Sequence, residues 1–134
     1  MYKTIADIQE ALSSGQTVSS IVESSISNIK GKSGLNAFVE IFEETALSAA
    51  AIVDEKIKNG SAGKLAGVIV GIKDNICYKD HMVSASSKIL TNFESIYTAT
   101  VLQRIIDEDA IIIGRLNCDE FAMGSTNETF AHLK

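Results

Sequence analysis

GVIVGIKDN, residues 67–75, is a short apolar run that ends on a lysine and an acid, and the fold class follows from it. Its β-branched residues and the lack of charge before Lys73 predict a strand that is buried on both faces. A second run of this kind, AIIIG, occupies residues 110–114, and helical apolar spacing lies between the two runs, over about residues 98–107. This order predicts a βαβ unit whose two strands are parallel neighbours or near neighbours in one mixed, mostly parallel sheet.

The first part of the chain has the pattern of packed helices. Thr4 to Asp7 has the [ST]xx[DE] form of a helix start. Apolar stripes predict helices over about residues 4–15, 18–30 and 41–59. At 134 residues the chain fits one domain. We therefore predict a single α/β domain with a helical part at residues 1–60 and a βαβ core at residues 65–134.

Composition and charge exclude several classes of protein. The formal net charge is −5 and no basic cluster is present, so a nucleic-acid surface on this chain is not expected, and any RNA is predicted to be held by a partner. No run approaches the eighteen or more apolar residues of a membrane span, and the first residues lack the apolar region of a secretory signal. We expect a cytoplasmic protein that makes no membrane contact.

Cysteines and histidines are few and widely spaced. Cys77 and Cys118 form no CxxC motif, and only His81 and His132 are present to assist them, so neither a disulfide framework nor a metal site is predicted. His81 with either cysteine is a conceivable thiol and base pair, but a solvated loop histidine is the expected role. The adjacent acids at 119–120 are interpreted as a solvated turn or helix start.

Lys73 allows two interpretations. Parallel strands end at the same edge of a sheet, and open α/β sheets bind ligands beyond that edge, so Lys73 and the polar segment at 115–128 are predicted to share it. Lys73 is either a charged residue that leaves its strand for water or an amine in a dry site, where burial disfavours the charged form of a lysine. The pattern favours the first interpretation, because lysines are almost never fully buried. Asp74 is expected to point to the opposite face.

Two longer stretches add a family resemblance. GVIVGIKDNI, residues 67–76, and AIIIGRLNCDEFAMGSTNE, residues 110–128, together resemble the amidase signature family. Within that family they resemble the A subunits of the glutamyl-tRNA(Gln)/aspartyl-tRNA(Asn) amidotransferases. The resemblance implies an amidase-signature fold and a catalytic triad of serine, cis-serine and lysine. In it Lys73 matches the lysine, while Met123, Gly124 and Ser125 match a segment that borders the substrate pocket.

The resemblance also implies an activity and its partners. The expected function is a glutaminase that supplies ammonia for the ATP-dependent amidation of Glu-tRNA(Gln) or Asp-tRNA(Asn). The expected partners are the B and C subunits of a heterotrimer, with glutamine as substrate and tRNA contacted mainly through the partner subunit. No cofactor is expected in this chain, because ATP and Mg belong to a partner subunit.

Two departures from the family pattern stand out. Ile69 occupies a position where the family usually has proline, and the sequence stops at Lys134, before the glycine- and serine-rich segment that carries both catalytic serines. Ser125 and the serines at 84, 86 and 87 do not match those positions. We therefore expect a truncated, N-terminal piece of the domain that is inactive alone. Two alternatives remain open, namely another amidase that acts on small amides and a non-catalytic interaction fragment.

Overall fold

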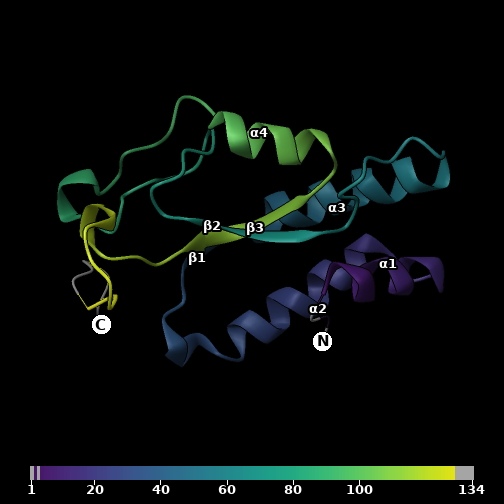
Figure 1. Ribbon diagram of the computed structural model, residues 1–134, viewed down its shortest axis with the longest axis horizontal. Helices are drawn as coiled ribbons and strands as arrows, with labels where there is room; N and C mark the ends of the chain where they lie inside the picture. The colour runs from purple at the N-terminus through teal and green to yellow at the C-terminus, as the bar shows by residue number, and fades with distance from the viewer. Residues whose placement is uncertain (1, 3, 129–134) are drawn as a thin grey trace.

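The computed structural model describes residue 2 and residues 4–128, and it forms part of a three-layer α/β fold (Figure 1). Its elements in chain order are α1 (Ile5–Ser13), α2 (Val18–Lys30), η1 (Ser33–Leu35), β1 (Phe38–Ile41), α3 (Glu43–Lys58), β2 (Ile69–Lys73), η2 (Lys88–Leu90), α4 (Thr100–Asp107), β3 (Ile111–Leu116) and η3 (Glu120–Ala122), where η denotes a short 3-10 helix. The predicted β2, α4 and β3 are present, and so are the three earlier helices.

The sheet has the order β1-β3-β2. β2 and β3 pair in parallel from Ile69 opposite Ile111 to Lys73 opposite Leu116, which confirms the predicted βαβ unit. β1 pairs antiparallel with β3, which makes the sheet mixed. The sequence pattern did not reveal β1 and placed the start of the third helix at Ile41, whereas α3 begins at Glu43. A strand of four residues is too short for its periodicity to stand out from a neighbouring helix.

Each face of the sheet packs against its own helices. Residues Ile111 and Ile113 of β3 lie in an apolar cluster with α2 and α3. Ile112, between them, belongs to a second cluster that includes Ile72 of β2 and Leu102 of α4. Alternation along the strand thus buries β3 on both faces, as its continuous apolar sequence predicts. In Figure 1, α4 lies on one side of the sheet, and α1 and α2 lie on the other.

The N-terminal helices are fixed by caps as well as by apolar packing. Thr4 and Asp7 form the predicted capping box of α1. The Asp54 carboxylate of α3 accepts hydrogen bonds from the backbone N–H groups of Val18 and Ser19, at 2.6 and 3.1 Å. A carboxylate at this place satisfies the free N–H groups of α2 and complements its dipole. These contacts join α2 to α3 beneath the sheet.

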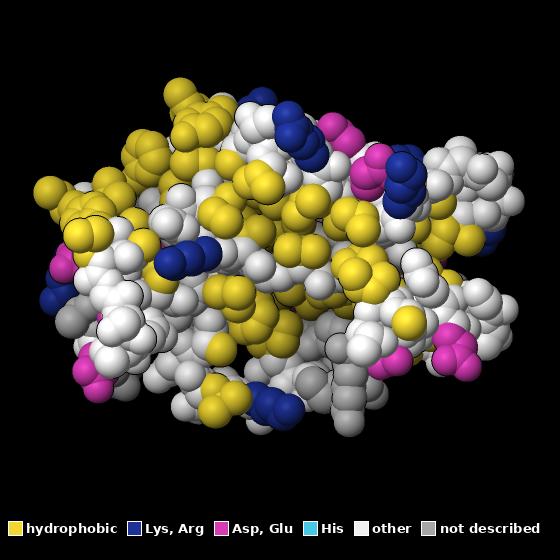
Figure 2. Space-filling view, in the orientation of Figure 1, with side chains coloured by type: hydrophobic (Ala, Val, Ile, Leu, Met, Phe, Trp, Pro, Cys, Tyr) yellow, Lys and Arg dark blue, Asp and Glu magenta, His cyan; other side chains and the backbone are white. Residues whose placement is uncertain are grey.

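Apolar side chains also lie on the outside of the molecule. Ile96 is 84% exposed, Ile89 80% and Val101 63%, all on α4 or in the segment before it. Figure 2 shows hydrophobic side chains across the middle of the face seen there, over the sheet and toward the segment that precedes α4. An extended apolar surface is typical of a region that other protein covers. Among the described residues, no helix is long and apolar enough to cross a membrane.

Candidate functional site

The candidate site lies where β2 and β3 end. Lys73 is the last residue of β2 and pairs with Leu116, the last residue of β3, so the two strands end together, as predicted. Gly71 faces the Leu116 side chain, and a Cβ placed at position 71 would lie only 3.1 Å from the Leu116 Cγ atom. The chain then continues into two loops beyond this edge, and both lie at the same end of the molecule in Figure 1.

Adjacent residues at the end of β2 differ sharply in burial. Lys73 is exposed, while Ile72 and Asp74 on either side of it are 4% and 1% exposed. Alternation along the strand therefore places Asp74 away from the face that Lys73 uses, which confirms the predicted direction. Within the described residues, the lysine leaves its strand toward solvent, and the dry environment that a neutral amine requires is not formed.

Asp74 is the centre of a buried polar network. Its Oδ1 atom accepts hydrogen bonds from the backbone N–H of Ser84, at 3.1 Å, and from Nη1 of Arg115, at 2.6 Å. Its Oδ2 atom accepts from the Ser84 hydroxyl, at 2.5 Å, and from the backbone N–H of Ser86, at 2.9 Å. A buried carboxylate is stable only when it is paired and hydrogen-bonded, and both conditions are met here.

The charges of this network form a row across the three strands. Arg115 of β3 donates from Nε to Glu40 of β1, at 2.9 Å, and from Nη1 to Asp74 beyond the end of β2. Burial raises the pKa of Asp74, but hydrogen bonds from Ser84, Ser86 and Arg115 outweigh burial and hold this pKa below its usual value. Asp74 is therefore ionised at neutral pH and fully paired.

The loop after β2 is also joined to the segment after β3. The Ser86 hydroxyl donates to the Asn117 side chain at 3.1 Å, and the Ser87 hydroxyl donates to Glu120 at 2.5 Å. The backbone N–H of Phe121 donates to the carbonyl of Ala85 at 2.8 Å. Ser86 and Ser87 are buried, so both act as structural links between the two segments.

Met123, Gly124 and Ser125 follow η3 at the same end of the sheet, and all three are exposed. Gly124 packs so closely against Asp119 that a Cβ at position 124 would lie 2.3 Å from the Asp119 carboxyl carbon. The Asp119 carboxylate also accepts from the backbone N–H of Asn127 at 3.0 Å. Asp119 is thus buried, precedes η3 as its N-cap residue and shapes the turn that presents residues 123–125, so of the two expected roles the helix start holds and the solvated turn does not.

His81 lies in a loop, as expected, but it is half-buried and its ring is packed against other side chains. Its ring stacks on Tyr78 with centroids 4.1 Å apart and meets Phe42 edge-on at 4.3 Å. Its Nδ1 atom lies 2.9 Å from the carbonyl of Lys79, and its Nε2 atom lies 3.3 Å from the Thr45 hydroxyl. Since a carbonyl only accepts, Nδ1 carries the proton in this arrangement. The ring is a packing element between two segments.

The cysteines form no metal or disulfide centre in the part that is described. Cys77 and Cys118 are free thiols, as expected. Across residues 2 and 4–128, no group of three or more histidine, cysteine, aspartate and glutamate side chains is placed to hold a metal ion. His132 lies outside the described residues.

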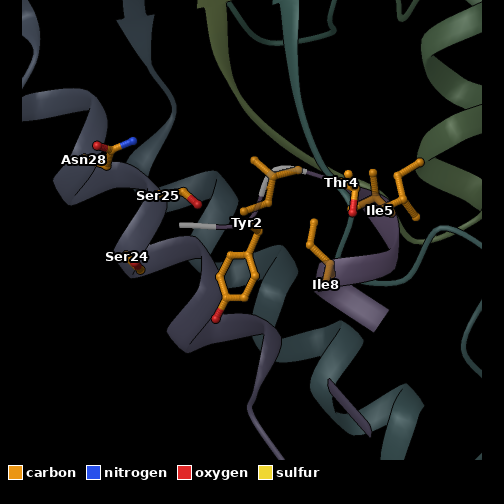
Figure 3. A pocket seen from close by; sticks show the side chains of 9 residues that line it. Tyr2, Thr4, Ile5, Ile8, Ser24, Ser25 and Asn28 are labelled. Carbon is orange, nitrogen blue, oxygen red and sulfur yellow. The ribbon is translucent and has the colours of Figure 1, made fainter. Parts of the chain in front are cut away.

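A separate cavity of about 500 Å³ lies at the opposite end of β2 (Figure 3). It is lined by residues of α1 and α2, including Ile5, Ile8 and Asn28, together with Val68 and Ile69. Its lining offers hydroxyl and amide groups but no carboxylate, amine or imidazole. Ile69, the residue in the usual proline position, pairs in the sheet opposite Ile111.

Comparison with known proteins decides the family. The model of the amidase family matches residues 20–132. The chain belongs to the amidase family. The amidase-signature resemblance and the α/β fold class predicted for it are thereby confirmed, since solved amidase structures have the same arrangement over this part.

This member of the amidase family has close relatives among tRNA-dependent enzymes. It is 48% identical over 131 residues to the A subunit of the glutamyl-tRNA(Gln) amidotransferase from Brachyspira hyodysenteriae, covering 94% of this chain and 27% of that protein. The protein of the same name from Agathobacter rectalis is 50% identical over 117 residues, covering 86% and 23%. The peptide amidase of Stenotrophomonas maltophilia superposes with a TM-score of 0.83 at 26% identity, covering 95% and 27%. The chain spans about a quarter of the length of these proteins.

The sequence pattern placed Lys73 and residues 123–125 at one edge of the sheet, as the structure does, but did not reveal the Asp74 network. Asp74 was predicted only to point away from Lys73. The available signal was the polar run at 84–87 after a buried strand, together with Arg115 directly after AIIIG. Such a pairing depends on how a loop folds back, and periodicity carries no information about that.

Proposed function

We propose that this chain is the N-terminal part of the glutaminase subunit of a tRNA-dependent amidotransferase, and that Lys73 is its catalytic base. The observation that carries the proposal is 48% identity over nearly the whole chain to the A subunit of a glutamyl-tRNA(Gln) amidotransferase. The position of Lys73 supports it, because the lysine ends β2, one of the two parallel strands of the βαβ unit, at the end of the sheet where open α/β sheets bind ligands.

The proposed reaction is hydrolysis of the side-chain amide of glutamine. Lys73, in its neutral form, takes a proton through a bridging cis-serine from the nucleophilic serine, which attacks the amide carbon. Backbone N–H groups stabilise the oxyanion, and the abstracted proton passes to the amide nitrogen as the C–N bond breaks, so that ammonia leaves and an acyl-serine ester forms. Water then hydrolyses this ester, which releases glutamate and restores the serine hydroxyl. Ser84, Ser86 and Ser87 donate structural hydrogen bonds to Asp74, Asn117 and Glu120, so none of the three is proposed as the nucleophile or the bridging serine. Met123, Gly124 and Ser125 are proposed to border the glutamine pocket.

The exposure of Lys73 sets a requirement for this mechanism. An amine that accepts a proton near neutral pH needs a desolvated or cationic environment, and the described residues leave the amine in water. We infer that the part of the domain beyond this quarter covers Lys73 and excludes the water. The chain alone, without nucleophile or cover, is therefore proposed to be inactive.

The proposed partners are those that the family resemblance implies. The ammonia passes to a B subunit, which with a C subunit completes a heterotrimer and amidates Glu-tRNA(Gln) or Asp-tRNA(Asn). ATP and Mg are used by the partner subunit, which also makes the main contacts with tRNA. The net charge of −5 supports this division, because a chain that neutralises phosphates needs clustered cations. The proposed location is the cytoplasm.

A chimera provides the test. This chain would replace the matching N-terminal quarter of the Brachyspira hyodysenteriae protein, coexpressed with its partner subunits, and glutamine-dependent ammonia release would be measured. Lys73→Ala is expected to remove nearly all activity. Lys73→Arg is expected to be almost as damaging, because guanidinium stays protonated and cannot accept the serine proton. Lys58→Ala, on the exposed surface of α3, serves as the control and should keep full activity. Substantial activity in the Lys73→Arg chimera rules out Lys73 as the catalytic base.

A hydrolase of small amides is the second candidate. It is favoured by the similarity to the peptide amidase structure, at 26% identity. The same chimera distinguishes the two, because a glutaminase subunit releases ammonia from glutamine and passes it to Glu-tRNA(Gln), whereas a hydrolase of other small amides leaves glutamine intact. A third candidate, a non-catalytic interaction fragment, predicts that the 134-residue chain binds the partner subunits and that no chimera containing it is active.

A further inference from the structure

Residues 84–86 form a backbone nest around Asp74. The N–H of Ser84 donates to Oδ1 at 3.1 Å, the N–H of Ala85 donates to the Asp74 carbonyl at 2.8 Å, and the N–H of Ser86 donates to Oδ2 at 2.9 Å. Successive N–H groups that converge in this way make an anion-binding concavity. Here the anion is a carboxylate of the same chain, and Asp74 is 1% exposed.

The nest is held in a strained conformation. Ala85 has φ 46° and Ser86 has φ 51°, both in the left-handed region. Each such residue costs about 1–2 kcal/mol when it carries a Cβ atom. Two successive strained residues persist only where the surroundings over-determine them, and such strain gathers at functional sites. The bonds to Asp74 provide that constraint.

Asp74 is fixed from the sheet side as well. Its backbone N–H donates to the carbonyl of Leu116 at 3.0 Å, and its carboxylate accepts a hydrogen bond from the Arg115 guanidinium at 2.6 Å. Lys73, just before it, is the last residue of β2, which lies at one edge of the described sheet. The end of an edge strand frays unless it is tied down. The Asp74 contacts tie it to β3 and to the nest at the same time.

We propose, on the basis of the proposed role of Lys73 as the base, that Asp74 is a positioning residue for that lysine. Its buried carboxylate clamps the 84–86 nest and Arg115, so that the peptide carrying Lys73 has one orientation while the amine itself stays free to react. Alternation along the strand makes this possible, because the clamp uses one face and the lysine uses the other. Catalytic rates are sensitive to such placement, and a shift of about 1 Å can cost about 100-fold.

Asp109 offers a matched control. It is also a buried carboxylate, 5% exposed, and it accepts hydrogen bonds from Lys56 Nζ at 2.6 Å and from the backbone N–H of Gly63 at 2.7 Å. It too ties a loop to a strand, but it precedes β3 at the end of the sheet opposite to Lys73. A purely structural role predicts the same catalytic consequences for both residues.

The test compares Asp74→Asn and Asp109→Asn in the chimera, with kcat and KM for glutamine measured per folded molecule. Asp74→Asn is expected to lower kcat by about 100-fold while KM changes by less than about threefold, because glutamine does not touch the carboxylate. Asp109→Asn is expected to keep kcat. Unchanged kcat in Asp74→Asn, or an equal loss in both variants, overturns the positioning role.

A second pair of variants covers the case in which Asp74→Asn does not fold. Ser84→Ala removes the hydroxyl that donates to Oδ2 at 2.5 Å, and Ser84→Thr retains a hydroxyl. In the alanine variant, kcat is expected to fall by about 3- to 10-fold, whereas the threonine variant is expected to have a kcat close to that of the parent. Equal kcat in both variants contradicts the proposal.

Lys73→Ala in the same chimera separates the two hypotheses. An active Lys73→Ala chimera contradicts both proposed roles, that of Lys73 as the base and that of Asp74 as its positioning residue. An inactive one, combined with normal kcat in Asp74→Asn, overturns the positioning role alone and leaves the proposed function in place.

Discussion

Two regions around β3 are held together by different interactions: the sheet face that packs on α2 and α3, and the edge where β2 and β3 end. Beneath the sheet, α2 and α3 bury apolar side chains against Ile111 and Ile113. At the carboxyl edge, the row of Glu40, Arg115 and Asp74 joins three segments through charge and hydrogen bonds. Apolar packing is non-directional and tolerates changes of similar volume, whereas a buried charge tolerates no loss of its partner. The edge is therefore the more vulnerable region, although it is the smaller.

The largest expected effect comes from removing the cation of the edge. In the chimera, Arg115→Leu leaves the Asp74 carboxylate buried without its positive partner, and breaking such a pair costs about 3–5 kcal/mol. Urea unfolding should show a correspondingly lower midpoint. Arg104→Leu, on the exposed side of α4, is the control and should stay within about 0.5 kcal/mol of the parent. An Arg115→Leu protein as stable as this control means that the network does not hold the edge.

Gly114 tests how closely the edge is packed. A Cβ at this position lies 2.4 Å from the carbonyl oxygen of Glu40, so β1 and β3 must separate to admit it. Gly114→Ala is expected to cost about 1–3 kcal/mol, as overpacking does. Gly34→Ala has open space around its new Cβ and should show no such loss in the same unfolding experiment. Equal stability of the two variants means that β1 is not held against β3 as described.

A small change beneath the sheet should matter less. Ile113 is 2% exposed in the cluster with α2 and α3, and Ile113→Val removes one buried methylene there. Such a deletion costs about 0.5–1.5 kcal/mol. If Ile113→Val lowers the free energy of unfolding in urea as much as Arg115→Leu does, the charged edge is no more vulnerable than the apolar cluster.

The smallest effect concerns acid stability. The pKa of Asp74 lies below 3.8 in the folded protein, so the unfolded chain takes up the proton first as the pH falls. The contribution of Asp74 is thus complete above 3.8 and is lost as the pH falls through the folded-state pKa. Asp74→Asn should flatten the dependence of stability on pH in this range. Burial raises the pKa of Asp109, but hydrogen bonds from Lys56 and Gly63 outweigh burial and lower this pKa, so Asp109 keeps its own contribution to the pH dependence of stability. An unchanged slope in urea unfolding between pH 3 and 5, roughly the titration range of a carboxylate, contradicts the ionic role of Asp74.

The sequence by itself determined the elements that have a strong period. Apolar spacing placed α1, α2, α4, β2 and β3 within a few residues, and the strand, helix, strand order implied the parallel pair that brings Lys73 and the segment after β3 to one edge. These features depend on local periodicity and on the rule that parallel strands end together.

Only the tertiary structure decided what surrounds Lys73. It showed that β1 joins β3, that residues 84–86 fold back onto Asp74, and that Arg115 links Asp74 to Glu40. Each of these contacts joins residues separated by at least ten positions in the chain, and no repeat or period records such a meeting. The physical reason is that burial and pairing of a charge depend on distant partners, whereas helix and strand periods depend on neighbours.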